Sequence, residues 1–273
     1  MLDGPMVAKQ YAAALWAGGG GTATTAQAAT TLSVAIPQSA TKTFGTIRLT
    51  DRHHKPKKTT YNGIQTRTIT NQLKPGNRQT LPVHVFTAQW AALSPTEVLV
   101  PTSFLSKDDA AAKAHEYIRI LGQIPVSLRA KARRIHVIPG LHNITGGGGD
   151  INLYQGSNYP KANYANMFTH EAAHTMNNDM RANPTLLAQW NAAVTADRLA
   201  GSRNRGFISK YAADNPTSED FGESLVAWSS LKFHQDRLRE ADPAYPLFIE
   251  SQIPNRIRFL RSFVTDLSPL STP

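Results

Sequence analysis

The chain contains no cysteine, and this absence narrows its possible chemistry. Without cysteine in its 273 residues, it can have no disulfide, no cysteine-ligated zinc and no thiol nucleophile. It also lacks any run of 18 apolar residues, so we expect no membrane-spanning helix. Acidic residues are few, with 19 Asp and Glu against 29 Lys and Arg, and the formal net charge is +10. A metal site would have to be built from histidine and carboxylate side chains.

The hydrophobic content is sufficient for a folded core. Hydrophobic residues make up 41% of the chain, which is enough for one large domain or two small ones. Residues 1–42 are an exception, because they are rich in Ala, Gly, Thr and Gln, with four glycines at 18–21 and few large apolar groups. We therefore predict a low-complexity, disordered leader there.

The pattern of apolar residues changes near residue 105. Apolar and polar residues alternate at 65–69 and 81–86, with Lys-Pro-Gly-Asn between the two runs, which predicts a small β-rich region over 43–105. Over 106–268, several runs have apolar residues every three or four positions, as in helices that face a core. This part is predicted to be one catalytic domain, mostly helical around a short sheet.

The net positive charge suggests an anionic partner. Its densest cluster is Arg-His-His-Lys-Pro-Lys-Lys at 52–58. No aromatic residue interleaves with these basic groups and no established recognition module surrounds them, so a solvated basic loop is the simpler interpretation. We do not expect a nucleic-acid partner. A basic protein that binds nucleic acid or an anionic surface, with a structural or degenerate zinc site, remains the alternative function.

The run His170-Glu171-Ala172-Ala173-His174 carries the strongest chemical signal. In a helix, residues four apart lie about 40° apart around the axis and roughly 6 Å along it, so both imidazoles face one point. Neutral imidazole is a good zinc ligand, and a catalytic zinc usually has three protein ligands. Glu171 can then accept a proton from a water molecule that the metal has acidified. We predict one Zn²⁺ per chain, with a third ligand still to be identified.

The best candidate for that ligand is Glu219, which lies four residues before Glu223 in a second predicted helix. Ser218 could cap this helix. Two carboxylates on one inward-facing stripe are costly unless they are paired or bind a metal. We assign Glu219 to the metal and Glu223 to a supporting position, where a carboxylate typically orients a ligating histidine.

The residues after the second histidine limit the zinc class. A third histidine in the extended motif would need Gly at 177 and His at 180, but the chain has Asn177 and Met180, so that class is excluded. A class with an aspartate ligand stays open, with Asp179, Asp214 and Asp220 as candidates.

Together these motifs resemble one peptidase family. Tyr211 and Asn215 are followed by Glu219, Phe221 and Glu223, a pattern similar to that of the catalytic domain of the anthrax lethal factor type, which is shared with the Pro-Pro endopeptidases. The resemblance covers roughly the C-terminal half, from the glycine-rich run near 146 to about 265.

The resemblance implies a zincin-like fold and specific residue roles. It makes His170, His174 and Glu219 the zinc ligands, Glu171 the general base, and Tyr211 the phenol that stabilises the oxyanion. It also favours delivery of the protein out of the producing bacterial cell as a toxin or effector, with a host cell as one destination. The chain departs from the pattern in a Tyr211 to Glu219 spacing one residue longer than expected, in Asn177 where an Asp is frequent, and in Gly222 where an Ala is usual.

A strand is predicted just before the metal-binding helix. The glycines at 146–149 lack the Gly-Lys-Ser/Thr that a phosphate-binding loop requires, so we interpret them as a hinge or bulge. The following strand is predicted to lie at the edge of the sheet and to hold an extended peptide substrate through backbone hydrogen bonds. Its residues are Asp150, Ile151, Asn152, Leu153 and Tyr154.

These inferences converge on one prediction. We expect an α+β fold with a zincin-like metallopeptidase domain, preceded by a small β-rich region and the leader. The expected activity is zinc-dependent hydrolysis of peptide bonds in a protein substrate.

Overall fold

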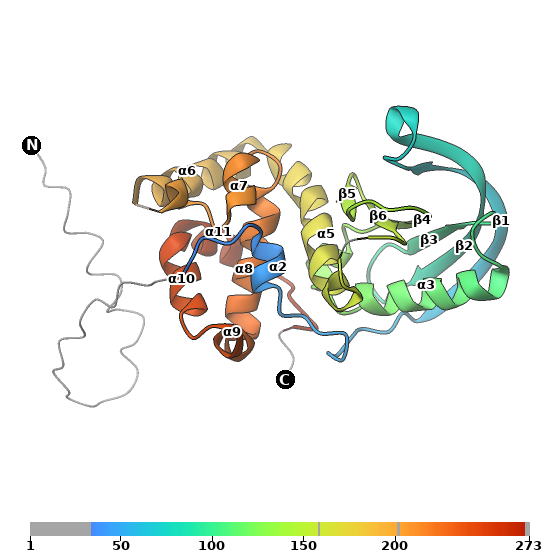
Figure 1. Cartoon of the computed structure of the whole chain (residues 1–273), viewed down its shortest axis with the longest axis horizontal. Helices are drawn as coiled ribbons and strands as arrows, with labels where there is room; N and C mark the ends of the chain where they lie inside the picture. Colours follow the sequence, from blue (N-terminus) through green and yellow to red (C-terminus); the bar gives the residue numbers. More distant parts are fainter. Residues whose placement is uncertain (1–33, 158, 201–202, 271–273) are drawn as a thin grey trace, which may run out of the picture. The chain divides into compact units, whose positions relative to one another are not determined.

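The computed structural model describes residues 34–157, 159–200 and 203–270 (Figure 1). Residues 1–33 of the predicted leader lie outside the described residues. Residues 34–42 belong to the same compact unit as the rest of the described chain, and Val34 and Ala40 are buried in it. The predicted leader boundary at residue 42 is thus wrong by several positions.

Six strands form one mixed sheet: β1 (Lys58–Thr70), β2 (Arg78–Gln89), β3 (Thr96–Pro101), β4 (Arg134–Ile138), β5 (Thr145–Gly147) and β6 (Asp150–Tyr154). Their order is β1-β2-β3-β4-β6-β5. The first three are antiparallel neighbours, β4 is parallel to both β3 and β6, and β5 is antiparallel to β6. The region 43–105 contains β1, β2 and β3, and it shares its sheet with the rest of the chain, because β3 and β4 pair across the border at residue 105.

The two faces of the sheet are covered differently. Val98, Ile135 and Ile151 are direct neighbours across β3, β4 and β6, and they belong to the main hydrophobic core. Leu99 and Tyr154 belong to a smaller cluster of buried residues. Successive residues of a strand point to opposite faces. Neighbouring apolar residues of one strand, such as Val98 and Leu99, therefore belong to two different cores on opposite faces of the sheet.

The helices of the described residues are α2 (Ala40–Phe44), α3 (Lys107–Leu121), α4 (Val126–Arg129), α5 (Tyr164–Arg181), α6 (Pro184–Ala200), α7 (Lys210–Asp214), α8 (Asp220–Phe233), α9 (Gln235–Ala241), α10 (Tyr245–Gln252) and α11 (Pro254–Phe263). Ser106 caps α3, since its Oγ accepts a hydrogen bond from the backbone N–H of Asp109 at 3.2 Å. The predicted cap of α8 by Ser218 is wrong, because Glu219 is the N-cap residue and makes no side-chain capping bond. The described part is mixed α and β, compatible with the predicted α+β class.

Helix α8 is the centre of the helical part. Its residues from Asp220 to Leu231 are all buried, and the helix reaches the surface at Lys232 in its last turn. Its first turn is tied to α11 by Arg256, whose Nε lies 3.0 Å from Asp220 Oδ2, and Arg256 Nη1 lies 3.3 Å from Asp197 Oδ2 in α6. All three side chains are fully or almost fully buried. This charged cluster holds α6, α8 and α11 together.

Helix α5 lies between the sheet and the other C-terminal helices, as Figure 1 shows in yellow. It packs against β5 and β6 on one side and against α8 on the other. The N-terminal segment crosses the same region: α2 packs against α8, and the carbonyls of Pro37 and Gln38 accept hydrogen bonds from the N–H groups of Lys210 and Tyr211, both at 2.9 Å. Among the described helices, none is both long and apolar enough to cross a bilayer.

Candidate metal centre

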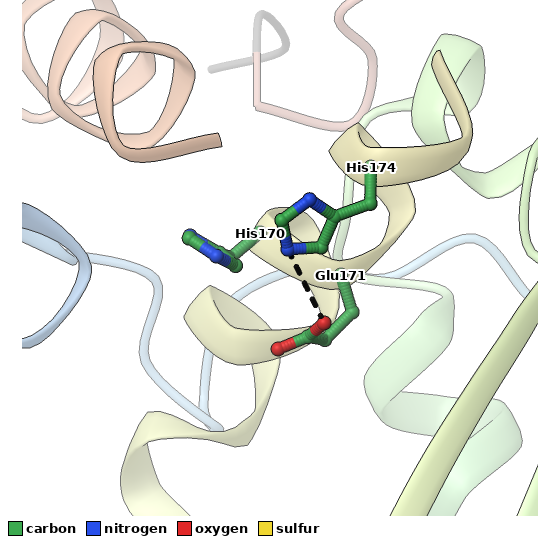
Figure 2. A group of neighbouring side chains, drawn as sticks. All are labelled: His170, Glu171 and His174. Carbon is green, nitrogen blue, oxygen red and sulfur yellow. Dashed lines mark ion pairs between the residues drawn. The ribbon is translucent and has the colours of Figure 1, made fainter. Parts of the chain in front are cut away.

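Helix α5 places the two histidines where the four-residue spacing predicts. His170 and Glu171 are both 4% exposed, and His174 is half-buried on the next turn. The two imidazole rings are nearly perpendicular, with centroids 4.8 Å apart. One ligand atom from each of His170, Glu171 and His174 can be chosen so that all lie within 4.8 Å of one another (Figure 2). The helix therefore presents two nitrogen donors and one carboxylate at a single point.

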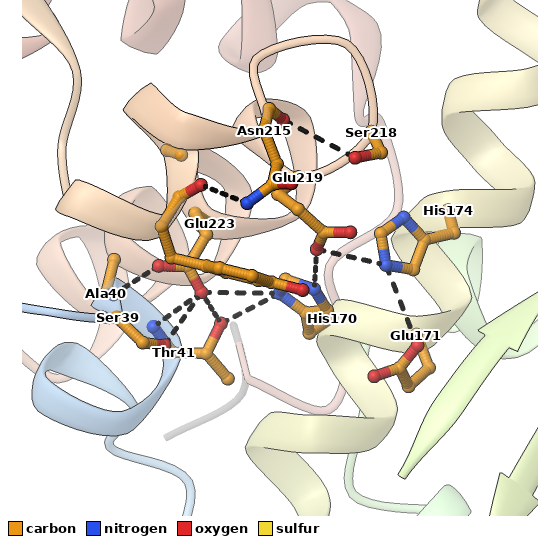
Figure 3. Close-up of polar contacts among 12 residues, drawn as sticks. Ser39, Ala40, Thr41, His170, Glu171, His174, Asn215, Ser218, Glu219 and Glu223 are labelled. Carbon is orange, nitrogen blue, oxygen red and sulfur yellow. Dashed lines mark hydrogen bonds and ion pairs between the residues drawn. The ribbon is translucent and has the colours of Figure 1, made fainter. Parts of the chain in front are cut away.

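Glu219, the N-cap residue of α8, brings a second carboxylate to the two imidazoles. Its Oε2 lies 3.0 Å from His170 Nε2 and 3.5 Å from His174 Nε2 (Figure 3). A tetrahedral zinc with bonds of about 2.0–2.1 Å holds its ligand atoms roughly 3.3 Å apart. The spacing of these donors suits such an ion. Glu171 Oε2 lies 3.6 Å from His174 Nε2 on the neighbouring side.

The protonation of the cluster follows from its burial and its carboxylates. Burial lowers the pKa of His170, but the hydrogen bond and the negative charges of Glu219, Glu171 and Glu223 outweigh this and raise it to about 9. Burial and the charge of His170 lower the pKa of His174 to about 4. Burial, with further contributions from Glu219 and Glu223, raises the pKa of Glu171 to about 8. Close carboxylates repel unless a positive charge joins them. Protonated His170 supplies one such charge among the three carboxylates.

Glu223 lies beside His170, as predicted, but its hydrogen bonds go elsewhere. Its Oε1 is 3.6 Å from His170 Nδ1, whereas Thr41 Oγ1 lies 2.9 Å from that nitrogen. The fully buried Glu223 carboxylate accepts hydrogen bonds from Thr41 Oγ1 at 2.7 Å, Ser209 Oγ at 2.7 Å and Ser39 Oγ at 2.9 Å. The backbone N–H groups of Ala40 and Thr41 complete the set. Thr41 thus stands between the supporting carboxylate and the histidine.

Tyr211 borders the same cleft. Its side chain is 39% exposed and lines the cleft together with Glu219. Burial, the charges of Glu219 and Glu171 and a hydrogen bond to Glu219 all raise the pKa of the phenol, so the hydroxyl keeps its proton. Asn215 caps α7, and its carbonyl accepts hydrogen bonds from the N–H groups of Ser218 and Glu219. These bonds order the longer connection between Tyr211 and Glu219.

The cleft has a volume of about 650 Å³ and is partly open to solvent. One wall is formed by the glycines at 146–147 in β5. An ideal Cβ on Gly146 would lie 2.6 Å from Glu171 Cβ, so only glycine fits there. Gly147, Gly148 and Gly149 have φ values of 128°, 61° and 93°, which glycine adopts readily. The predicted hinge is a defined turn between β5 and β6.

The predicted position of the substrate strand is wrong. Asp150–Tyr154 forms a strand with the predicted bounds, but β6 is an inner strand, paired with β4 on one side and β5 on the other. None of its residues lines the cleft. The edge at the cleft belongs to β5, three residues long. Because β5 folds back through the glycine turn, the sequence did not reveal which strand ends the sheet.

The aspartate candidates are directed away from the histidines. Asp179 pairs with Lys131 at 2.8 Å, Asp220 faces Arg256, and Asp214 is exposed at the end of α7. None of the three lines the cleft. Of the predicted ligand alternatives, only Glu219 reaches both imidazoles.

Sequence reasoning missed several residues of the centre. Ser39 and Thr41 fall within the predicted leader, and Tyr159 falls outside every predicted motif. Tyr159 lines the cleft, where burial and the charges of Glu171, Glu223 and Glu219 raise the pKa of its phenol. Ser39 followed by a short run ending in Phe44 is a helix-start signal, but only the tertiary structure links it to His170. Comparison with family models, curated proteins and solved structures found no match for the chain.

Proposed function

We propose that this protein is a zinc-dependent endopeptidase with a zincin-like catalytic domain. The observation that carries the proposal is the meeting of His170 Nε2, His174 Nε2 and Glu219 Oε2 at distances suited to one ion, with the Glu171 carboxylate beside them. The placement of α5 between a mixed sheet and a helical cluster supports the same proposal. So does the resemblance of its motifs to the anthrax lethal factor type of catalytic domain.

The donor set suits zinc. Two imidazoles and one carboxylate are a common set for a catalytic zinc, with a fourth position left for water or substrate. When bound, zinc supplies Lewis acidity, which lowers the pKa of the attacking water and polarises the scissile carbonyl. The chain has no cysteine, so these oxygen and nitrogen donors are also the only strong ligands it can offer here.

Glu171 provides the base. Its side chain is buried in the cleft wall, and burial raises the pKa of its carboxyl to about 8. A cation beside it lowers this pKa and favours the carboxylate form. Glu171 then accepts a proton from water as the water oxygen attacks the carbonyl carbon. It passes this proton to the leaving nitrogen when the carbon–nitrogen bond breaks.

Tyr211 provides the hydrogen-bond donor. Its phenol remains protonated because burial and the nearby carboxylates raise its pKa. A donor directed at the carbonyl oxygen stabilises the charge that develops there. We assign the stabilisation of the oxyanion to Tyr211. Tyr159 lines the same cleft.

An extended peptide fits the cleft along β5. This strand ends the sheet next to the metal centre, and an edge strand can add one more strand from a substrate through backbone hydrogen bonds. The remaining charged residues of the wall, Lys42 and Arg181, are cationic. This arrangement suits a protein substrate with acidic residues near the cleaved bond.

Two substitutions test the proposal. Glu171→Ala removes the base and leaves the three donors, so we expect one zinc per chain and no cleavage of a peptide library analysed by mass spectrometry. Glu219→Ala removes a donor, so we expect loss of stoichiometric zinc. Glu116→Ala is the matched control, because Glu116 pairs with Lys113 and Lys161 outside the cleft.

The results also separate the alternative function. Unchanged cleavage by Glu171→Ala would refute the mechanism, and zinc retained by Glu219→Ala would refute the ligand set. Salt-sensitive nucleic-acid binding without any cleavage would favour a basic binding protein. Action outside the producing bacterial cell is part of the proposal, and detection of the protein in the culture medium tests it.

A further inference from the structure

Thr41 makes an unusual connection between the N-terminal segment and the metal centre. It lies 129 positions from His170 and 182 positions from Glu223 in the sequence, yet it contacts both. Its side chain is 3% exposed. Figure 3 shows Thr41 between the carboxylate of Glu223 and the ring of His170.

The hydrogen bonds of Thr41 determine that the Nδ1 nitrogen of His170 carries a proton. A hydroxyl has one proton to donate, and an ionised carboxylate can only accept. Thr41 Oγ1 lies 2.7 Å from Glu223 Oε1, so the hydroxyl proton goes to Glu223. The 2.9 Å contact with His170 must then run from Nδ1–H to Thr41 Oγ1. With the Nδ1 proton held in this way, Nε2 is the nitrogen directed at Glu219.

Glu223, at the end of this chain of hydrogen bonds, is held by several other donors. Glu223 is held by Ser39 and Ser209 as well as by two backbone N–H groups of the N-terminal segment. On its other side the ring packs on α8, where an ideal Cβ on Gly222 would lie 3.0 Å from His170 Nδ1. The imidazole is therefore fixed both by hydrogen bonds and by packing.

We propose that Thr41 is a positioning residue of the metal centre, because it fixes His170 in the form that offers Nε2 to the ion. The segment 37–44 is then a part of the centre. This inference rests on the proposed function for its metal, but the Nδ1–H to Thr41 bond exists without one. Partners of this kind fix both the tautomer and the ring orientation of a ligating histidine, and their loss typically weakens metal binding.

Conservative substitutions at Thr41 test the proposal. Thr41→Val keeps the shape and removes the hydroxyl, and we expect zinc binding about 10- to 100-fold weaker in competition with a chromophoric chelator. Thr41→Ser keeps the hydroxyl and should restore binding close to that of the unsubstituted chain. Thr96→Val is the matched control, since the equally buried Thr96 hydroxyl bonds Trp90 and Ala132 far from the cleft.

A second measurement needs no zinc. In metal-free protein labelled with ¹⁵N-histidine, we expect a His170 Nδ1 proton protected from solvent exchange, and we expect this signal to be lost in Thr41→Val. Failure of the unsubstituted chain to bind zinc would refute the proposed function, and the Nδ1 signal would still decide the role of Thr41. A folded Thr41→Val protein with unchanged zinc affinity would overturn the proposal. So would an unprotected Nδ1 proton in the unsubstituted chain, or equal loss of zinc in Thr96→Val.

Discussion

Gly146 in β5 packs closely against Glu171 in α5. An ideal Cβ on Gly146 would lie 2.6 Å from Glu171 Cβ and 3.0 Å from the carbonyl oxygen of Glu171. Neither atom is the end of a flexible side chain. The cleft wall and the proposed base are therefore held at a distance that a single methyl group would increase.

The first prediction concerns this contact. Gly146→Ala should push β5 away from Glu171, lower kcat/KM by up to about 100-fold through misplacement, and cost about 1–3 kcal/mol of unfolding free energy through overpacking. Zinc stoichiometry should not change, because no ligand moves. Peptide-cleavage kinetics and metal analysis on the same sample measure both effects. Wild-type kinetics would show that β5 does not place the substrate.

The second prediction concerns removal of the metal. A ligand that binds only the folded state raises stability by about 2.7 kcal/mol at 100 times its Kd. Chelation should therefore lower Tm, and added zinc should restore it. In Glu219→Ala, Tm should be the same with and without zinc, since a donor is missing. Calorimetry of both proteins measures this, and an equal zinc effect in the two would exclude Glu219 as a ligand.

The third prediction concerns the buried charges at the start of α8. Arg256 is fully buried between Asp220 and Asp197. Arg256→Ala leaves two buried carboxylates without their cationic partner, which should cost about 3–5 kcal/mol. Arg258→Ala is the control: Arg258 is exposed on the same helix and bonds only Asn255 among the contacts described, so its loss should stay within about 0.5 kcal/mol. Urea unfolding compares the two, and similar values would contradict the role of the buried pair.

The fourth prediction concerns acid stability. Burial raises the pKa of Asp51, but hydrogen bonds from Arg237 and from the backbone of Arg48 outweigh it and lower the pKa below 3.8. The folded state then holds fewer protons than the unfolded state in this range. The contribution of Asp51 to the unfolding free energy is thus complete above pH 3.8, and it is lost as the pH falls through the lowered pKa. When unfolding free energy is plotted against pH, Asp51→Asn should remove the part of the slope that Asp51 contributes.

Unfolding free energies between pH 5 and about pH 2 test this prediction. Asp108→Asn, at an exposed position in the first turn of α3, serves as the control. An unchanged slope in Asp51→Asn would show that the Asp51–Arg237 pair, 2.6 Å between Oδ2 and Nη1, does not contribute to acid sensitivity.

The sequence by itself determined the local parts of the candidate site. The four-residue spacing of His170 and His174 is enough to direct both rings to one point, because an α-helix has a fixed period. The bounds of the strand Asp150–Tyr154 likewise depend on neighbouring residues, and the structure confirms them.

Only the tertiary structure decided which distant residues meet. Glu219 reaches both imidazoles because the buried Arg256 cluster anchors α8 beside α5, and Thr41 reaches His170 because Glu223 holds the N-terminal segment. The place of β5 at the sheet edge and the single sheet formed by β1–β6 depend on long-range pairing. Such contacts arise from packing between segments far apart in the chain, which local periodicity does not encode.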